Sequence, residues 1–167
     1  MLISLLNSIL KPNNIEREAV YYKTKELNQI AKIPQEFAVK VWRPTVFNLV
    51  PPQKPFKYIV LSFAYLLRLL SNRNYFLIQV FDNEQNVSSL LVVPKIFKFD
   101  YMKKKDIQFI YVMTNANYRG MNIAAATVLE AVKHLTEKVD GYWYVTNTTN
   151  KASIRVAEKL GFKRITN

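Results

Sequence analysis

The order of apolar and polar positions predicts a mixed first half for the chain. Residues 15–31 are polar with scattered apolar side chains, and we expect a helix there. Residues 36–42 alternate between apolar and polar side chains, which predicts a strand. Four prolines break residues 44–55 into a loop, and the apolar run over residues 56–70 predicts a buried helix.

The second half of the chain repeats strands and helices at shorter intervals. Apolar runs at residues 75–81 and 87–97 flank the turn-forming residues 82–84, which is typical of a hairpin. A lysine-rich loop and a strand over residues 107–113 follow.

The last third of the chain predicts a helix over residues 119–138 and a strand over residues 142–146. A second helix over residues 151–160 precedes a short tail, residues 162–167. Strands and helices in this order predict an α/β (α+β) domain with a mixed sheet.

The composition excludes several kinds of functional site but says little about the fold. A chain of 167 residues, half of them hydrophobic, fits one domain with a substantial core. It contains no cysteine and a single histidine, His134, which excludes disulfides, thiolate ligands and a two-histidine metal site within one chain. We therefore expect no metal cofactor and a cytoplasmic protein.

The chain carries a formal net charge of +12. A solvated basic surface explains this charge, and so would a phosphate-rich ligand, an acidic substrate or nucleic acid. The basic residues are spread along the sequence with no basic helix, so we do not expect a nucleic-acid partner. The most apolar window, residues 58–67, is about half as long as a membrane span requires, and we expect none.

The segment after the predicted strand 107–113 has the pattern of an anion site. A polar loop follows the strand, and Arg119 and Gly120 open a helix with an apolar stripe. Free N–H groups and the helix dipole at such a terminus favour a pyrophosphate. An ordinary strand-loop-helix crossover would show the same pattern.

A second pattern covers residues 147–162. Asn150 occupies the N-cap position of the last helix, and Gly161 follows its end. Any well-capped helix needs these residues, but capping does not explain why Asn147 and Asn150 both lie where the preceding strand ends.

These two segments resemble motifs of the GNAT superfamily of N-acetyltransferases. Residues 118–124, Tyr-Arg-Gly-Met-Asn-Ile-Ala, are similar to its acyl-CoA pyrophosphate loop. Residues 150–162, from Asn150 to Phe162, are similar to its C-terminal motif, closest to the ribosomal-protein N-terminal acetyltransferase branch. The resemblance covers residues 106–162, the expected acyl-CoA-binding core of a single 1–167 domain with residues 1–35 as a helical appendage.

The resemblance implies a GNAT-like, mostly antiparallel sheet flanked by helices, with its fourth and fifth strands splayed apart. It also implies acetyl-CoA as co-substrate, with an amine, an amino sugar or a protein N-terminus as acceptor. The implied cofactor-binding residues are Val112, Met113, Thr114, Arg119, Gly120, Met121, Asn122, Ile123, Ala124, Asn147, Asn150 and Ser153. The implied catalytic residues are Tyr111, for a polar role near the thioester, and Ser153.

The sequence departs from the family pattern in three places. Asn122 replaces a glycine of the pyrophosphate loop, and Ala157 replaces the tyrosine with which many members protonate the leaving thiolate. The chain also ends soon after Phe162, so either the sheet is incomplete or a second copy completes it in a homodimer. We expect a slow acetyltransferase; the alternative is a GNAT-fold binding or assembly module with weak or no catalysis.

Overall fold

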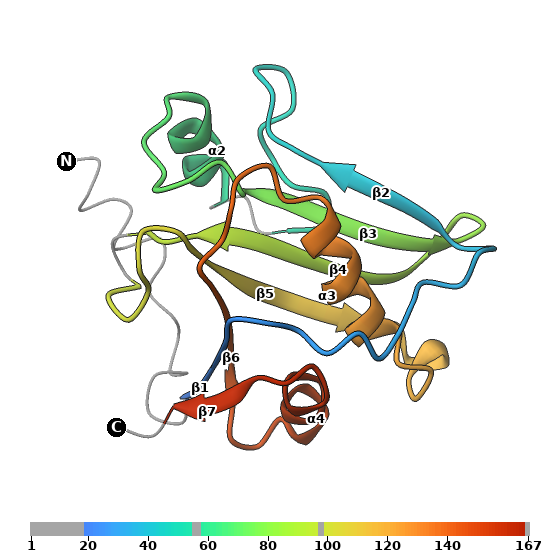
Figure 1. Ribbon diagram of the computed structural model, residues 1–167. Helices are drawn as coiled ribbons and strands as arrows, with labels where there is room; N and C mark the ends of the chain where they lie inside the picture. Colours follow the sequence, from blue (N-terminus) through green and yellow to red (C-terminus); the bar gives the residue numbers. More distant parts are fainter. Residues whose placement is uncertain (1–18, 55–57, 97–98, 166–167) are drawn as a thin grey trace.

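A mixed seven-stranded sheet forms the centre of the computed structural model, which describes residues 19–54, 58–96 and 99–165 (Figure 1). The strands lie in the order β2-β3-β4-β5-β6-β1-β7, and only β5 and β6 pair in parallel. Their bounds are β1 Ala19–Thr24, β2 Ala38–Trp42, β3 Phe76–Asp82, β4 Gln85–Pro94, β5 Asp106–Thr114, β6 Gly141–Asn147 and β7 Lys163–Ile165. The predicted fold class is confirmed.

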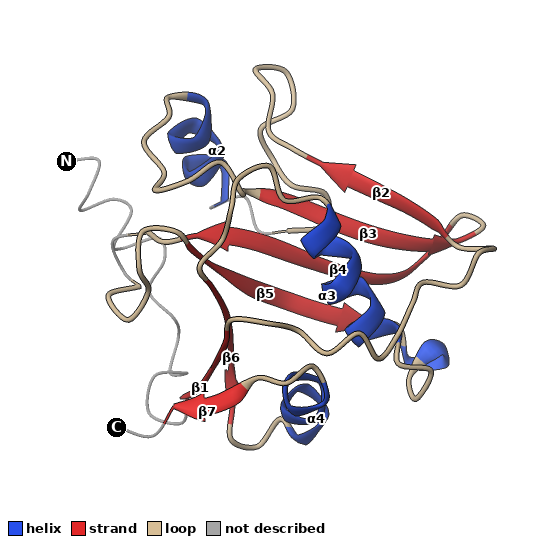
Figure 2. Cartoon of the chain, viewed as in Figure 1, coloured by secondary structure: helices blue, strands red, loops and turns tan. Residues whose placement is uncertain are grey.

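Helices cover both faces of the sheet. Helix α3 (Ile123–Lys133) crosses in front of β4 and β5 (Figure 2), where Leu90 and Ile78 join its apolar side chains in one core. Their neighbours Leu91 and Leu77 point to the opposite face and pack against residues of α2 (Ile59–Leu66). The alternation of strand side chains thus divides the core into two layers. Two further helices lie in the described residues, η3 (Ala116–Tyr118) and α4 (Lys151–Lys159).

The prediction of a helix over residues 15–31 was wrong. Residues 19–24 form strand β1, residues 25–34 contain no helix, and residues 1–18 lie outside the described part. Strand β1 inserts between β6 and β7, and buries Val20 and Tyr22 against the core. Residues 19–22 form a short apolar run in the sequence, but the polar residues around it favoured a helix. We expected the sheet to be incomplete beyond β6, or to be completed by a second chain. In the structure, β1 of the same chain occupies the position beside β6.

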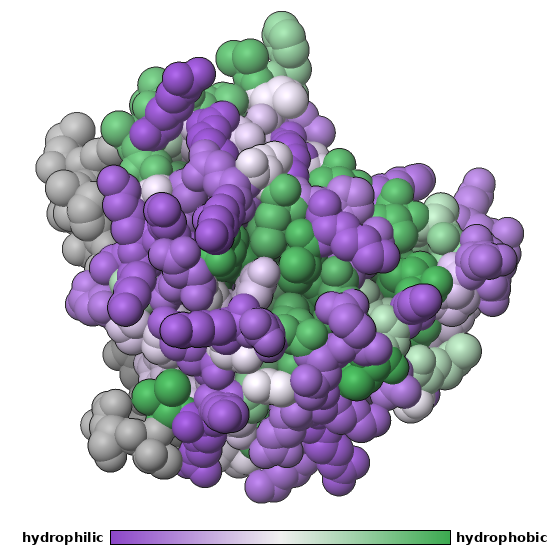
Figure 3. Space-filling model, in the orientation of Figure 1, coloured by the Kyte–Doolittle hydropathy of each residue, from purple (hydrophilic) through white to green (hydrophobic). Residues whose placement is uncertain are grey.

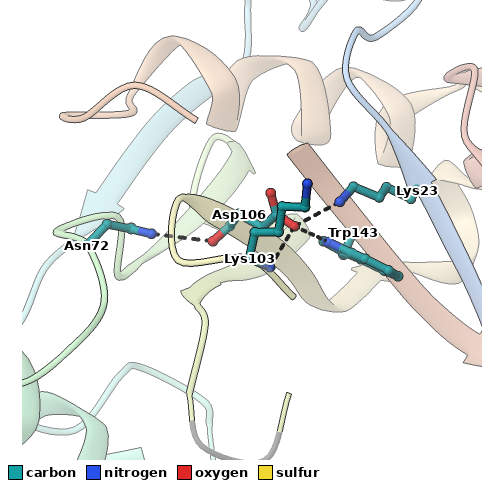
Figure 4. Close-up of polar contacts among 5 residues, drawn as sticks. All are labelled: Lys23, Asn72, Lys103, Asp106 and Trp143. Carbon is teal, nitrogen blue, oxygen red and sulfur yellow. Dashed lines mark hydrogen bonds and ion pairs between the residues drawn. The ribbon is translucent and has the colours of Figure 1, made fainter. Parts of the chain in front are cut away.

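A buried carboxylate joins three of these strands. Asp106, fully buried at the start of β5, accepts hydrogen bonds through Oδ2 from Trp143 Nε1 (2.7 Å), Lys23 Nζ (2.9 Å) and Lys103 N–H (3.0 Å) (Figure 4). Burial raises the pKa of Asp106, but these hydrogen bonds and the Lys23 charge outweigh burial and lower the pKa overall. Because Lys23 belongs to β1 and Trp143 to β6, Asp106 ties β1 to the end where β5 and β6 are paired.

Beyond that end, β5 and β6 separate. Their pairing covers only residues 106–109 of β5 and residues 141–144 of β6. The rest of β5 continues beside β4 alone, and two residues, Tyr111 and Val112, bulge opposite Leu90. Tyr111 adopts a left-handed conformation with φ of 51°, which is rare for a bulky residue and marks a locally strained backbone. Strands β5 and β6 correspond to the fourth and fifth strands predicted from the sequence. These two strands are therefore the ones expected to splay apart.

Candidate functional site

A groove of about 540 Å³ lies where β5 and β6 separate, and we call it the splay groove. Its walls come from the end of β5, the loop before α3, the start of α3, and α4. Ten residues predicted to bind the cofactor line it: Val112, Met113, Thr114, Arg119, Gly120, Asn122, Ile123, Ala124, Asn150 and Ser153. Tyr118, Ala125, Tyr144, Ala152, Arg155, Val156 and Lys159 complete the lining. The fold thus brings together segments that are separate in the sequence.

One wall of the splay groove is an open strand edge. Residues 110–114 of β5 pair with β4 on one side, while β6 has already turned away on the other. Within the described part of the chain, the backbone groups on that side therefore have no neighbouring strand. Such an edge can accept an extended ligand that hydrogen-bonds as an additional strand.

Helix α3 begins four residues later than predicted. Gly120 has φ of 85° and Asn122 φ of 58°, and a right-handed helix cannot contain such left-handed residues. The loop therefore extends to Asn122, and the helix starts at Ile123 and ends at Lys133, short of the predicted residue 138. Asparagine tolerates this conformation better than most residues, which suits Asn122 to the left-handed position that it occupies.

The N-terminus of α3 offers unpaired donors to the splay groove. The N–H of Ala126 bonds the carbonyl of Asn122, so the N–H groups of Ile123, Ala124 and Ala125 precede the first intrahelical hydrogen bond. No side chain caps this terminus, and its first turn holds no acidic residue. These N–H groups and the helix dipole favour an anion at this point.

The charges that line the splay groove have one sign. Arg119, Arg155 and Lys159 line it, and none of its described lining residues is acidic. Lys159 Nζ donates a hydrogen bond to Asn122 Oδ1 (2.9 Å), which turns this side chain toward α4. Figure 3 shows apolar side chains in the middle of the face that carries α3, with hydrophilic ones around them. Cationic and apolar groups together suit a ligand with phosphates and an aliphatic arm.

The two asparagines predicted near the cofactor have different positions. Asn150 lines the splay groove and caps α4, because its Oδ1 accepts a hydrogen bond from the N–H of Ser153 (3.1 Å). Asn147 does not line the groove, and its Oδ1 accepts hydrogen bonds from the N–H and hydroxyl of Thr149.

A pair of hydroxyl groups lies inside the splay groove. The hydroxyl oxygens of Ser153 and Tyr144 are 2.9 Å apart, and both residues line the groove. Burial raises the pKa of Tyr144. The hydrogen bond with Ser153 lowers this pKa, but burial has the larger effect. Ala157 is fully buried in the same core cluster as Tyr144. Sequence reasoning missed Tyr144, because an aromatic residue within a buried strand carries no signal that its hydroxyl reaches a groove.

Besides Asn147, two more predicted residues lie outside the groove lining. Met121 is 57% exposed on the loop before α3. Tyr111 points to the α2 side of the β5 bulge, where its hydroxyl accepts a hydrogen bond from Tyr58 (3.0 Å). The described residues hold no cluster of metal-ligating side chains and no helix that could cross a membrane.

Comparison with known proteins gives a consistent result. The family model for the acetyltransferase (GNAT) family matches residues 41–162. No curated protein matches the sequence at a significant level.

Several solved structures share the fold. One is a GNAT-family acetyltransferase from Colwellia psychrerythraea, with 13% identity and a TM-score of 0.56 over 88% of this chain and 52% of that chain. A tandem GNAT protein from the clavulanic acid biosynthesis pathway matches with 11% identity and a TM-score of 0.57 over 88% of this chain and 51% of its own. A GCN5-related N-acetyltransferase-like protein from Streptococcus suis 89/1591 matches with 14% identity and a TM-score of 0.52 over 89% and 58%. The chain therefore spans little more than half the length of these structures.

Proposed function

The chain belongs to the acetyltransferase (GNAT) family, and we propose that it transfers an acetyl group from acetyl-CoA to an amine. The observation that carries the proposal is the splay groove, which joins an open strand edge to an uncapped helix terminus among cationic side chains. We propose that residues 1–167 act as one domain, with residues 106–162 as its acyl-CoA-binding core. A chain without cysteine suits the reducing cytoplasm, which is the proposed location.

The groove residues fit the parts of acetyl-CoA in order. The N–H groups at the start of α3, with Arg119 and Lys159, would hold the pyrophosphate. The backbone of Val112 and Thr114 would hydrogen-bond the pantetheine arm along the open edge of β5. Asn150 and Ser153 lie at the opposite wall, on α4. When bound, acetyl-CoA supplies an acetyl thioester, which a neutral amine can attack.

The protein would contribute polar groups near the carbonyl oxygen of the thioester and near the departing thiolate. A backbone N–H of β5 near the bulge can donate to the oxygen on which negative charge develops. The hydroxyl of Tyr144 can donate a proton to the departing thiolate, either directly or through Ser153. This pair would replace the tyrosine that is absent at Ala157.

The proposed acceptor is an amine, and the family resemblance bears on its class. The likeness of residues 150–162 to the ribosomal-protein N-terminal acetyltransferase branch supports a protein N-terminus, while amino sugars and small amines remain candidates within the family.

Calorimetry with acetyl-CoA, followed by measurement of thiol release with a panel of amines, tests the proposal. We expect binding and slow turnover. Absence of acetyl-CoA binding would refute the assignment of the splay groove. Binding without turnover by any acceptor class would instead favour a GNAT-fold binding module.

A further inference from the structure

A polar cluster lies on the α2 side of the β5 bulge, opposite the side that carries α3. Lys54 Nζ donates a hydrogen bond to Ser89 Oγ (3.3 Å) and lies 5.4 Å from the ring centroid of Tyr111. The hydroxyl of Tyr58 donates to that of Tyr111. We call Lys54, Tyr58, Ser89 and Tyr111 the Lys54 cluster.

The orientation of β4 sets the side of the sheet on which the cluster lies. Ser88 accepts a hydrogen bond from Thr127 of α3, so its side chain faces that helix. Ser89 is the next residue and points to the other face. Lys54 and Tyr111 therefore meet on the face away from α3, and Tyr111 itself is 37% exposed there. Solvent thus reaches the cluster.

The charge of Lys54 has no counter-ion among the residues that the structure describes. No carboxylate in this part of the chain lies within 4.0 Å of its Nζ, and the groups it contacts there, Ser89 and the ring of Tyr111, are neutral. Burial lowers the pKa of Lys54. A half-buried cation of this kind gains from an anionic partner more than an exposed surface lysine does.

The cluster is next to the proposed site of chemistry. Tyr111 belongs to the Lys54 cluster, and Val112, the next residue, lines the splay groove. The two residues form the bulge of β5, so the bulge separates the cluster from the groove by the thickness of one strand. A small molecule bound at the cluster would therefore contact the residue that precedes the groove lining.

We propose that Lys54 binds an anionic group of the acceptor, so that the preferred acceptor is a small amine that also carries a carboxylate or a phosphate. This inference rests on the proposed acetyl transfer. Lys54 would donate its charged hydrogen bonds to the anion, and the hydroxyl of Tyr111 would be available as a further donor.

Matched acceptors that differ only in the anionic group test the inference. Glycine is compared with glycinamide for the carboxylate, and glucosamine 6-phosphate with glucosamine for the phosphate. With the unaltered protein we expect the anionic member of at least one pair to have the higher kcat/KM, by about tenfold or more, as one charged hydrogen bond provides. The pair that shows the difference identifies the anion.

Two substitutions locate the effect. Lys54→Met should remove the preference by raising KM for the anionic acceptor alone, while Lys54→Arg should retain most of it. Equal rates for both members of each pair would overturn the inference. So would a loss of kcat in both variants for neutral and anionic acceptors alike, because that result assigns Lys54 to proton transfer.

A binding measurement separates this inference from the proposed function. The side-chain NMR signal of Lys54, assigned with Lys54→Arg in protein labelled with ¹³C-lysine, is followed during titration with glycine and with inorganic phosphate. A saturable shift of that signal supports the inference even if acetyl-CoA does not bind. Absence of a shift with either anion overturns it even if the protein acetylates neutral amines.

Discussion

Replacing Ala124 with glutamate should affect stability and acetyl-CoA binding in opposite directions. Ala124 lies in the first turn of α3, which has no acidic residue, and lines the splay groove. A carboxylate there interacts favourably with the helix dipole, by about 0.3–1 kcal/mol. Ala124→Glu should therefore unfold at the same temperature as the unaltered protein or slightly above it.

The same carboxylate should strongly weaken the binding of acetyl-CoA. At about 5 Å and an effective dielectric constant of about 20, repulsion between one carboxylate and one phosphate charge is about 3 kcal/mol, a factor of about a hundred in Kd. Ala124→Gln is the matched control, because it adds nearly the same volume without charge and should bind at least tenfold more tightly than the glutamate variant. Calorimetry measures both Kd values, and thermal melting measures stability. Undiminished binding by a folded Ala124→Glu protein would refute the placement of the pyrophosphate.

Asn150→Asp should keep the cap of α4, which is worth about 1 kcal/mol, but weaken acetyl-CoA binding by adding negative charge to the groove; unchanged affinity would leave Asn150 only its structural role. Asp106→Asn should lower the free energy of unfolding by about 3 kcal/mol, the low end for a broken buried ion pair because Lys23 keeps some solvent contact. Since the folded-state pKa of Asp106 lies below its unfolded value, its contribution is present above about pH 4 and is lost as the pH falls further, and denaturant titrations should show this acid dependence weakened in the variant. Tyr144→Phe should lower kcat by about 10²-fold with little change in acetyl-CoA affinity, and Ser153→Ala should cause a smaller loss of the same kind; normal kcat in both would exclude the hydroxyl pair from proton donation.

Local patterns were sufficient to predict much of the second half of the chain. The cap at Asn150 and the end of the helix at Gly161 involve neighbouring residues only, and both were read correctly. The start of α3 was misplaced, because the left-handed conformation of Asn122 depends on the loop around it and not on its own preference. The spacing of apolar residues that predicts a helix gives no sign of a left-handed residue at its start.

Features that depend on distant residues could not be predicted. The polar residues around β1 favoured a helix, and its pairing with β6 and β7 makes it a strand. Tyr144 and Ser153 meet because β6 and α4 fold back on each other, and Lys54 meets Tyr111 from a proline-rich loop. In each case the sequence contained the residues but not their proximity.

The position of β1 affects the order in which the chain can fold during synthesis. Residues 19–24 leave the ribosome early, but both of their partner strands lie beyond residue 140. Until then Val20 and Tyr22 have no partner strand to pair with, and the edge of β6 that β1 will occupy does not exist. Pairing across so long a separation is slow, so we expect the β2–β5 part of the sheet to form first, with closure by β1 as the late step. A nascent chain arrested before residue 141 should therefore leave residues 19–24 accessible to protease, whereas the complete chain should protect them.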